Sequence, residues 1–449
     1  MTFSSPGQQH GQVLPLALVL LVAVAATTFY MFNSGQLVQE KLRLTNTADA
    51  VAYSAGVFEA RMLNYDAYTN RAIIANQIAI GQAVGLASWA KYMGTSADNI
   101  GPYLYLIPYV GPALKAAMDH VASIMEIFTP ALAAAIPLHD TAIQALALSQ
   151  QVMHGPGDSV ALGNRLAVMQ RVARENDPEA VVDPVPISDD FIGFTRNHES
   201  REERRRMGRV VSDSRESFLR SRNWNFGLVV LCTGIQLRKR GGTELIDLAD
   251  GWKSMDTLSA HRYRIRRFSC RRSERPIGYG TAFSEEDLAD SAYSYSVPRS
   301  TNPRASRRAD SGEGIAEGFD PAPSTIGGGA IPTFKELSHH APSKWTTRSR
   351  SSRSGSRKPP ATSAIRAARA SSGPRGGSNC MTEPIRGGQS AAAARVEVFF
   401  ERPDAGNPRH PDRNELGSLF NPYWQVRLAP ITPAERLMAQ LRQGGLQLP

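Results

Sequence analysis

Cysteine is scarce in this chain of 449 residues, which contains three. Three cysteines exclude a fold built on a framework of disulfides and a zinc cluster held by several thiolates. Charged residues make up 20% of the chain and apolar residues 42%, while glycine (37) and proline (29) are plentiful. These totals exclude collagen, coiled-coil rods and polytopic membrane proteins, and the length allows a sizeable core.

Charge is absent from the beginning of the chain, where no Asp, Glu, Lys or Arg precedes Glu40. This stretch contains the apolar run VLPLALVLLVAVAATTFYMF at 13–32. A helix of this length, at about 1.5 Å per residue, spans roughly 30 Å, which is the hydrocarbon thickness of a bilayer. We therefore predict a transmembrane anchor within residues 1–35, with the apolar side chains Val13, Leu14, Leu16, Leu18, Leu20, Leu21, Val24, Phe29, Tyr30 and Phe32.

Two other interpretations of this segment compete with a permanent anchor. The small residues A-V-A at 23–25 fit a signal-peptide cleavage site, although a basic n-region is absent and apolar residues continue to Phe32. The second alternative is a buried core helix, for which such a long uninterrupted apolar run is unusual. Lys41 and Arg43 follow the segment and no basic residue precedes it, so the positive-inside rule favours a cytoplasmic carboxyl-terminal region.

One long helix, or two, is predicted directly after the anchor. No proline lies between Pro15 and Pro102, and residues 36–93 are rich in Ala, Leu, Gln and Asn, with breaks only at Gly56, Gly81 and Gly85. Small residues at helical spacing permit close approach of another helix, either an anchored partner or the protein's own domain. The predicted packing positions are Asn46, Ala48, Asp49 and Ala52.

A second helical block is predicted downstream and completes a helical region at 36–177. Its apolar i, i+3, i+4 pattern begins at Leu114, and Asp177-Pro178 ends its last helix.

The amino-terminal region resembles a known family. Gly11-Gln12, the apolar span, NSGQLV at 33–38 and KLRLTNTADA at 41–50 are similar to the amino terminus of Tad-type (Flp) pilus-assembly proteins of the G-like group. The resemblance covers about residues 8–85. It implies a single-pass protein of the bacterial inner membrane, with most of the chain outside that membrane. It also implies other pilus-assembly or secretion proteins as partners, and a role in pilus biogenesis and adhesion.

The chain departs from relatives of this family at two places. Leu16 stands where prepilin-like members carry a Glu after the processing glycine, so prepilin-type cleavage is not expected. DSRES at 213–217 has Arg where the Asp-x-Ser-x-Ser metal site of longer members needs its first Ser, so no such site is predicted.

The carboxyl-terminal half differs in charge from the amino-terminal half. Residues 1–190 carry 9 Lys/Arg against 15 Asp/Glu, and residues 191–449 carry 42 against 26. We predict a linker at 178–200, a mixed α+β domain at 201–335 with a buried strand at 224–237 and another at 243–248, and strands with a short terminal helix at 391–449.

Between them, residues 336–390 form a basic Ser/Arg-rich segment. It holds nine Lys/Arg and no acidic residue between Lys344 and Cys380, a composition typical of disorder. A frame-shifted reading of a once-ordered segment is an alternative origin. These patterns predict an α-rich fold with one transmembrane helix, a long juxtamembrane helix and a carboxyl-terminal mixed α+β domain that carries a disordered insert.

Motifs that carry chemistry are weak in this sequence. Gly157-Asp158-Ser159 resembles the opening of a hydrolase motif, but no strand precedes it, and capping of the next helix by Asp158 or Ser159 explains it. His198-Glu199 lacks the second His of a zinc-binding helix, and His339-His340 has no thiol nearby. We predict no catalytic, cofactor or metal site.

Cys232 and Cys270 are a candidate disulfide in an oxidising compartment, with two buried reduced thiols as the alternative. Cys380 lies in the basic segment and is expected to stay free.

The function predicted from the sequence is that of a non-catalytic inner-membrane-anchored component of a Tad/Flp-type pilus assembly or secretion system. Membrane lipid, other assembly proteins and a helix-mediated oligomer are the expected partners, and no nucleic acid is expected. The alternatives are an envelope hydrolase that uses Ser159, and a cytoplasm-facing tether whose basic segment holds nucleic acid or anionic lipid.

Overall fold

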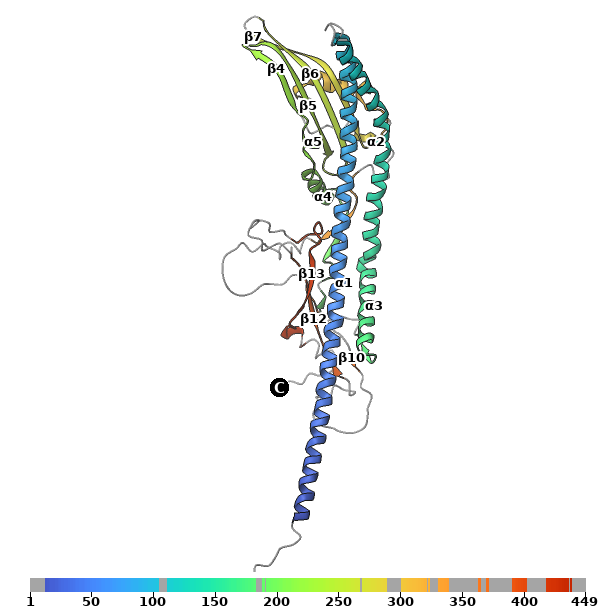
Figure 1. The fold of residues 1–449 in the computed structure, drawn as a ribbon, viewed down its shortest axis with the longest axis vertical. Coiled ribbons are helices and arrows are strands. Elements are labelled where there is room, and N and C mark those ends of the chain that lie inside the picture. The colour runs from blue at the N-terminus through green and yellow to red at the C-terminus, as the bar shows by residue number, and fades with distance from the viewer. Residues whose placement is uncertain are drawn as a thin grey trace, which may run out of the picture.

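One helix runs through most of the length of the molecule (Figure 1). The computed structural model describes residues 13–104, 111–182, 188–189, 191–266, 269–288, 300–320, 322–323, 330–338, 362–364, 369–370, 390–401, 417–435 and 437. Helix α1, Val13–Leu104, has 92 residues, which corresponds to roughly 140 Å at about 1.5 Å per residue. The anchor segment and the predicted juxtamembrane helix are therefore parts of the same helix.

The predicted breaks in this helix at Gly56, Gly81 and Gly85 do not occur. Each of these glycines instead lies where another element crosses α1 closely. A Cβ atom on Gly56 would lie 2.5 Å from Val426, one on Gly81 would lie 2.9 Å from the Trp252 ring, and one on Gly85 would lie 2.7 Å from a side chain of the sheet. The glycines serve packing, because their missing side chains let the strands approach the helix.

Two further helices return along α1. Helix α2, Gly111–His154, continues through Pro130 and Pro137 and lies beside α1 in the opposite direction (Figure 1). The short helix η1, Pro156–Asp158, leads into α3, Ser159–Asn176. Gly155 and Gly157 have φ angles of 69° and 58°, a left-handed conformation that glycine adopts without strain. The predicted sequence of a long apolar helix followed by a second long helix is confirmed.

A four-stranded antiparallel sheet lies beside the distal half of α1 (Figure 1). Its strand order follows the chain: β4 Trp224–Val230, β5 Thr233–Ile246, β6 Gly251–Arg266 and β7 Ser269–Phe283. The prediction of a single buried strand at 224–237 is wrong, because Leu231 and Cys232 form a turn with φ angles of 44° and 65°. Strand β4 is mostly exposed rather than buried.

Short helices and strands complete the carboxyl-terminal half. The helices are α4 Arg201–Asp213, α5 Ser217–Arg220, η2 Glu286–Leu288, α7 Pro303–Ala309 and η3 Gly312–Gly314. Strand β3, Thr195–His198, falls in the predicted linker and pairs with β8, Phe334–Leu337. The strands predicted within 391–449 appear as β12, Arg395–Phe400, paired with β13, Trp424–Ala429.

Two very short strands, β9 Thr362–Ala364 and β2 Ser188–Asp189, extend the β12–β13 pair into a four-stranded sheet. Three others, β1 Ala180–Val181, β10 Arg369–Ala370 and β11 Ser390–Ala391, form a separate sheet. The predicted disorder of residues 336–390 falls largely outside the described residues, and so does most of the predicted terminal helix.

The largest core is shared between the helices and the sheet. It joins Ile80 and Val84 of α1 and Ile143 of α2 to Met207 of α4 and Trp252 of β6. The strand-containing half is therefore packed directly on α1. The opposite face of the sheet is covered by α7, whose Ala305 and Ala309 contact Met255 and Tyr279.

Candidate functional site

The predicted anchor side chains project from the body of the protein. All ten are more than half exposed, from 57% for Leu20 to 76% for Val13 and Leu14. Leu44 is the first buried residue along α1, so the helix leaves the body as a bare apolar rod (Figure 1). An exposed apolar surface of this length and continuity is typical of a segment that lies in lipid.

Three hydroxyl groups within or next to this rod are satisfied by the helix itself. The hydroxyls of Thr27 and Thr28 donate to the carbonyls of Ala23 and Val24 at 2.7 and 2.8 Å. The Ser34 hydroxyl donates to the carbonyl of Met31 at 3.0 Å. Because hydrocarbon offers no hydrogen-bond partner, these internal bonds make the segment compatible with a bilayer.

Within the described residues, two helical regions are long and apolar enough to cross a membrane by length and composition alone, and they differ in their place in the molecule. The first starts at Val13 and its most apolar window is wholly unburied, while the second lies within 111–176 and is partly buried. The second region lies alongside the distal part of α1, so the two do not lie at the same level along the molecule (Figure 1).

The predicted helix-packing positions face two directions. Ala48 and Ala52 are fully buried against Met169 and Ala173 of α3 and Val396 of β12. Asn46 is exposed. The alanine face of α1 is therefore covered by the chain's own α3 and β12, which corresponds to the predicted alternative of packing on its own domain.

Asp49 and Arg43 lie where the body of the protein begins. Asp49 is partly buried, and this burial raises the pKa of its carboxyl group. Arg43 forms an ion pair at 3.3 Å with Asp177, which follows the end of α3. The ion pair links the end of the helical region to the part of α1 that leaves the body.

A buried ionic network joins α1, α2, η1 and β8, and no sequence motif indicated it. The two ring nitrogens of His154 contact Asp158 Oδ1 at 2.9 Å and Asp66 Oδ2 at 2.8 Å. The Lys335 ammonium lies 3.2 Å from Asp158 Oδ1. Burial lowers the pKa of His154, but the hydrogen bonds to Asp158 and Asp66 outweigh it and raise the pKa above its ordinary value. Burial raises the pKa of Asp66, against the lowering effect of His154 and Lys335. Burial acts in the same direction on Asp158, but His154 and Lys335 outweigh it and lower the pKa of that carboxyl group.

Amide side chains extend this network. The Gln150 amide donates to Asn70 Oδ1 at 2.8 Å, and Asn70 donates to the carbonyls of Lys335 at 2.8 Å and Leu419 at 2.7 Å. Segments that are more than 300 residues apart in the chain meet through one amide. The network holds the carboxyl-terminal segment on the helices, which is a structural role.

The hydrolase-like motif has a structural explanation that differs from the one predicted. Asp158 stands at the N-cap position of α3, but its side chain makes no capping hydrogen bond and binds His154 and Lys335 instead. Ser159 is exposed at the start of α3. Both nitrogens of His154 are engaged by carboxylates, so that this imidazole has no free nitrogen for activating Ser159.

A second buried ionic cluster fastens the sheet to α1. Asp256 of β6 accepts hydrogen bonds from Arg222 Nε at 2.9 Å and Nη2 at 2.7 Å, and from the Ser88 hydroxyl at 2.9 Å. The Lys239 ammonium also binds Asp256 and lies 4.2 Å from the centroid of the Tyr92 ring. Burial raises the pKa of Asp256, but Arg222 and Lys239 outweigh it and lower the pKa to about 2.

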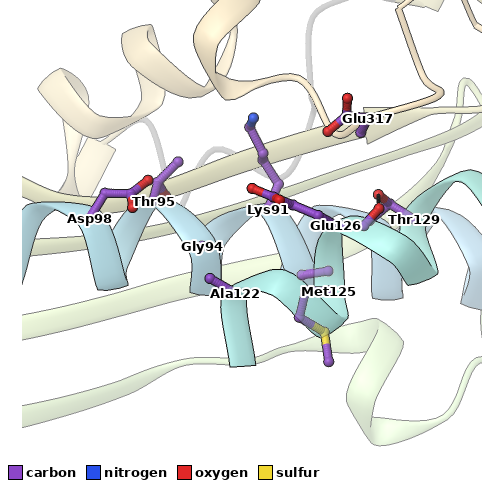
Figure 2. A pocket seen from close by; sticks show the side chains of 10 residues that line it. Lys91, Gly94, Thr95, Asp98, Ala122, Met125, Glu126, Thr129 and Glu317 are labelled. Carbon is purple, nitrogen blue, oxygen red and sulfur yellow. Dashed lines mark hydrogen bonds between the residues drawn. The ribbon is translucent and has the colours of Figure 1, made fainter. Parts of the chain in front are cut away.

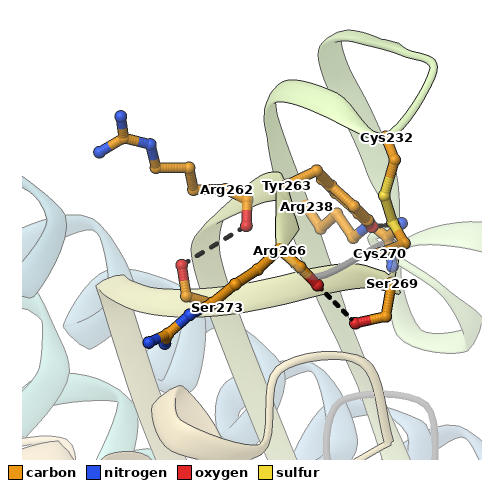
Figure 3. The surroundings of a disulfide bond; sticks show 8 residues. All are labelled: Cys232, Arg238, Arg262, Tyr263, Arg266, Ser269, Cys270 and Ser273. Carbon is orange, nitrogen blue, oxygen red and sulfur yellow. Dashed lines mark hydrogen bonds between the residues drawn. A yellow bond between two sulfur atoms is a disulfide. The ribbon is translucent and has the colours of Figure 1, made fainter.

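The two candidate disulfide cysteines lie at the distal end of the sheet, far from the anchor. The structure joins Cys232, in the β4–β5 turn, to Cys270 of β7, with 5.7 Å between their Cα atoms (Figure 3). Cys380 lies outside the described residues.

A pocket between α1 and α2 offers little chemistry. Its charged lining consists of Lys91, Asp98, Glu126 and Glu317 (Figure 2). The lining includes no His, Cys or Ser, and its Thr95 hydroxyl donates to the Tyr279 carbonyl at 2.7 Å. The pocket therefore lacks a nucleophile paired with a base.

Metal ligands do not gather in the described part of the chain, where no group of three His, Cys, Asp or Glu side chains could hold an ion. His198 lies in β3, buried against the Phe334 ring at 5.1 Å. His339 and His340 lie outside the described residues.

The amino-terminal region matches a known family over the exposed rod and the start of the body. Residues 11–60 match the family described as "Putative Flp pilus-assembly TadE/G-like". This Tad match confirms the resemblance drawn from the sequence for this region, and it supports a general role in pilus assembly. Neither a curated protein nor a solved structure matches the chain. The sheet and the ionic networks lie outside the Tad segment, so their roles rest on the structure alone.

Proposed function

We propose that the chain is a non-catalytic component of a Tad/Flp-type pilus assembly or secretion system. Residues 13–32 hold it in the bacterial inner membrane, and its body lies on the periplasmic side, where it contacts other assembly proteins and contributes to pilus biogenesis and adhesion. The position of the Tad match carries the proposal, because residues 11–60 join the exposed apolar rod to the first buried turns of the body.

The disulfide supports the periplasmic orientation. Disulfides persist in oxidising compartments and are rare in the cytoplasm, and Cys232 and Cys270 are paired at the end of the molecule furthest from the anchor. The opposite orientation is favoured only by Lys41 and Arg43, and two basic residues give a small bias.

A structural role for the titratable groups supports the absence of catalysis. The buried carboxylates Asp66, Asp158 and Asp256 are each engaged by cations of the same chain. The envelope-hydrolase alternative depends on Ser159. A hydrolase activity that appears in purified protein and is lost in Ser159→Ala would contradict the proposal.

Membrane anchoring is tested by charge in the rod. Leu20→Arg with Leu21→Arg places two guanidinium groups at the middle of the apolar run. Each raises the free energy of membrane insertion by about 2.5–3.5 kcal/mol. We expect the variant to leave the membrane pellet after alkaline carbonate washing, with loss of surface pili and of adhesion. Leu148→Arg is the matched control, because Leu148 of α2 is 58% exposed and Leu20 is 57% exposed. Wild-type protein in the carbonate supernatant would contradict the proposal.

Orientation is tested with single cysteines in a Cys380→Ser background. Val152→Cys places a thiol on α2, at a side chain that is 65% exposed, and Gln8→Cys places one before the anchor. We expect a membrane-impermeant maleimide to label position 152 in cells with a permeabilised outer membrane, and to label position 8 only after lysis. The reverse pattern would favour the cytoplasm-facing tether that uses the basic segment.

A further inference from the structure

The outer end of the four-stranded sheet exposes an unusual number of apolar side chains. This end, called the tip here, comprises residues 228–235, 262–266 and 269–273. Leu231 in the β4–β5 turn is 87% exposed, and the other exposed apolar residues are Leu228 (74%), Ile265 (61%), Ile235 (55%) and Val230 (53%). A cluster of large exposed apolar side chains at one end of a protein marks a site of interaction with a membrane or with another protein.

The apolar side chains lie on both faces of the sheet. Leu228 is directly opposite Ile235, and Ile235 is opposite Arg262, so these three share a face. Ile265 lies three residues after Arg262 on β6 and therefore points to the other face. A flat, rigid protein surface would cover only one face of the sheet at the tip. A lipid bilayer is fluid, and it would surround both faces of the sheet and the β4–β5 turn.

Arginines surround these apolar side chains. Five guanidinium groups are exposed, and none has a carboxylate partner among the described residues: Arg262, Arg264, Arg266, Arg271 and Arg272. The nearby carboxylate of Glu274 instead accepts hydrogen bonds from the Ser259 hydroxyl at 2.8 Å and from the backbone of Arg304 at 2.8 Å. Figure 3 shows Arg262 and Arg266 extending away from the disulfide. Guanidinium groups bind phosphate oxygens in a bidentate manner, so the partner is anionic.

The backbone holds the tip in a fixed shape. Leu231 and Cys232 both adopt left-handed backbone conformations, which glycine or asparagine usually occupies in a two-residue hairpin turn. Glycine at position 231 would fit the backbone and would remove the most exposed apolar side chain of the tip. The disulfide ties this turn to β7 beside the arginines, so apolar and cationic groups are presented together.

We propose that the tip binds the surface of an anionic phospholipid bilayer, with the β4–β5 turn inserted at the level of the headgroups and the arginines on lipid phosphates. The distance from Phe32 to Leu104 along α1 is roughly 110 Å at about 1.5 Å per residue, and the tip lies beside the far end of α1 (Figure 1). The bound bilayer is thus a second membrane and not the one that holds the anchor, a conclusion that rests on the proposed function.

In the test, the full chain is held in nanodiscs of phosphatidylcholine and mixed with vesicles of phosphatidylcholine that contain or lack phosphatidylglycerol. The fraction of the protein that floats with the vesicles is measured. We expect binding to the anionic vesicles only, weakened by salt. Each basic side chain at an anionic surface contributes about fivefold to binding, so Arg264→Glu with Arg271→Glu is expected to lower vesicle partitioning at least roughly 25-fold. Leu231→Asp is expected to lower it at least roughly tenfold, because a charge replaces the inserted side chain.

Matched controls separate the tip from the rest of the chain. Arg209→Glu changes an exposed arginine of α4, and Leu148→Asp changes an exposed leucine of α2. Both should bind within about twofold of wild type, and a thiol count should show that every variant keeps its disulfide. Binding that persists in both tip variants would assign it to the basic segment and overturn the inference, as would no binding by wild type. Carbonate washing of the same variants reports on the anchor independently.

Discussion

Asp256 provides the sharpest test of how the sheet is held on α1. Its carboxylate is fully buried between Arg222 and Lys239, whose side chains are 7% and 2% exposed. Asp256→Asn keeps the size of the side chain and removes its charge, which leaves two buried cations without a counter-ion. Breaking a buried ion pair in this way costs about 3–5 kcal/mol of unfolding free energy.

The pH dependence of unfolding gives a second measure of the same site. The folded-state pKa of Asp256 is about 2, and the ordinary value of an aspartate is 3.8. Because the folded pKa is depressed, the stabilisation is complete above about pH 4 and is lost as the pH falls towards 2. The difference corresponds to about 2.5 kcal/mol. Asp256→Asn should lack this part of the acid sensitivity.

The assay is denaturant unfolding of detergent-solubilised protein, followed by fluorescence of the tryptophans, of which Trp252 is fully buried beside α1. Asp247→Asn is the control, because Asp247 is 42% exposed and forms ion pairs with exposed Arg201 and half-buried Arg205. That control should cost less than about 1 kcal/mol. If Asp256→Asn is as stable as this control at neutral pH, the ionic cluster does not hold the sheet.

Three further predictions concern other parts of the fold. The pKa of His154 is raised in the folded protein, so the stability that this residue contributes is present below its unfolded pKa and is lost as the pH rises through the folded value. His154→Gln should therefore flatten the dependence of unfolding free energy on pH above about pH 6.5. An unchanged dependence would contradict the network. Cys232→Ser should destabilise the sheet by up to about 3–4 kcal/mol, seen as faster hydrogen exchange in β4–β7, while exchange in α3 should not change. Gly81→Ala should destabilise the protein by about 1–3 kcal/mol, because the new Cβ atom would meet the Trp252 ring at 2.9 Å. Gly94→Ala has open space around its Cβ atom and should stabilise the protein by about 0.5–1 kcal/mol. Equal effects of the two variants in thermal unfolding would refute the packing argument.

The helices were the most predictable part of the fold, and the glycines within α1 show the limit of that prediction. Composition and the absence of proline indicated a long helix, and the apolar run indicated its exposed end. Gly56, Gly81 and Gly85 were interpreted as breaks, because propensity counts only the backbone cost of glycine. Their reason is tertiary, since each is crossed by a residue from the distant carboxyl-terminal half.

The strand-containing half was predictable only in outline. The β4–β5 turn escaped notice because Leu231 and Cys232 are not residues typical of a turn, although both have positive φ angles. The prediction of a buried strand at 224–237 also missed the exposure of β4, because an apolar run does not by itself show which strand is covered by the rest of the fold.

The ionic networks could not be found from the sequence at all. Asp66 and His154 lie 88 residues apart in the sequence, and Asp256 and its partner Arg222 lie 34 residues apart. No local spacing relates such residues, so the pairing depends on which strand crosses α1 at which turn. Asp158 illustrates the consequence: its position at the start of a helix suggested a cap, and its actual partners are His154 and Lys335.

The continuity of α1 links the two ends of the molecule mechanically. Between the exposed rod and the part of α1 that packs on the sheet, the helix has no proline and no break, so every residue in between keeps its backbone hydrogen bonds. A flexible linker would let the sheet adopt many heights above the membrane, whereas a helix fixes both its height and its rotation at about 1.5 Å and 100° per residue. Gly56, Gly81 and Gly85 are each covered by packed side chains, whereas Gly35, next to the exposed rod, has open space around it. The body is therefore a rigid strut, and the position of its tip is set by the membrane segment from which it rises.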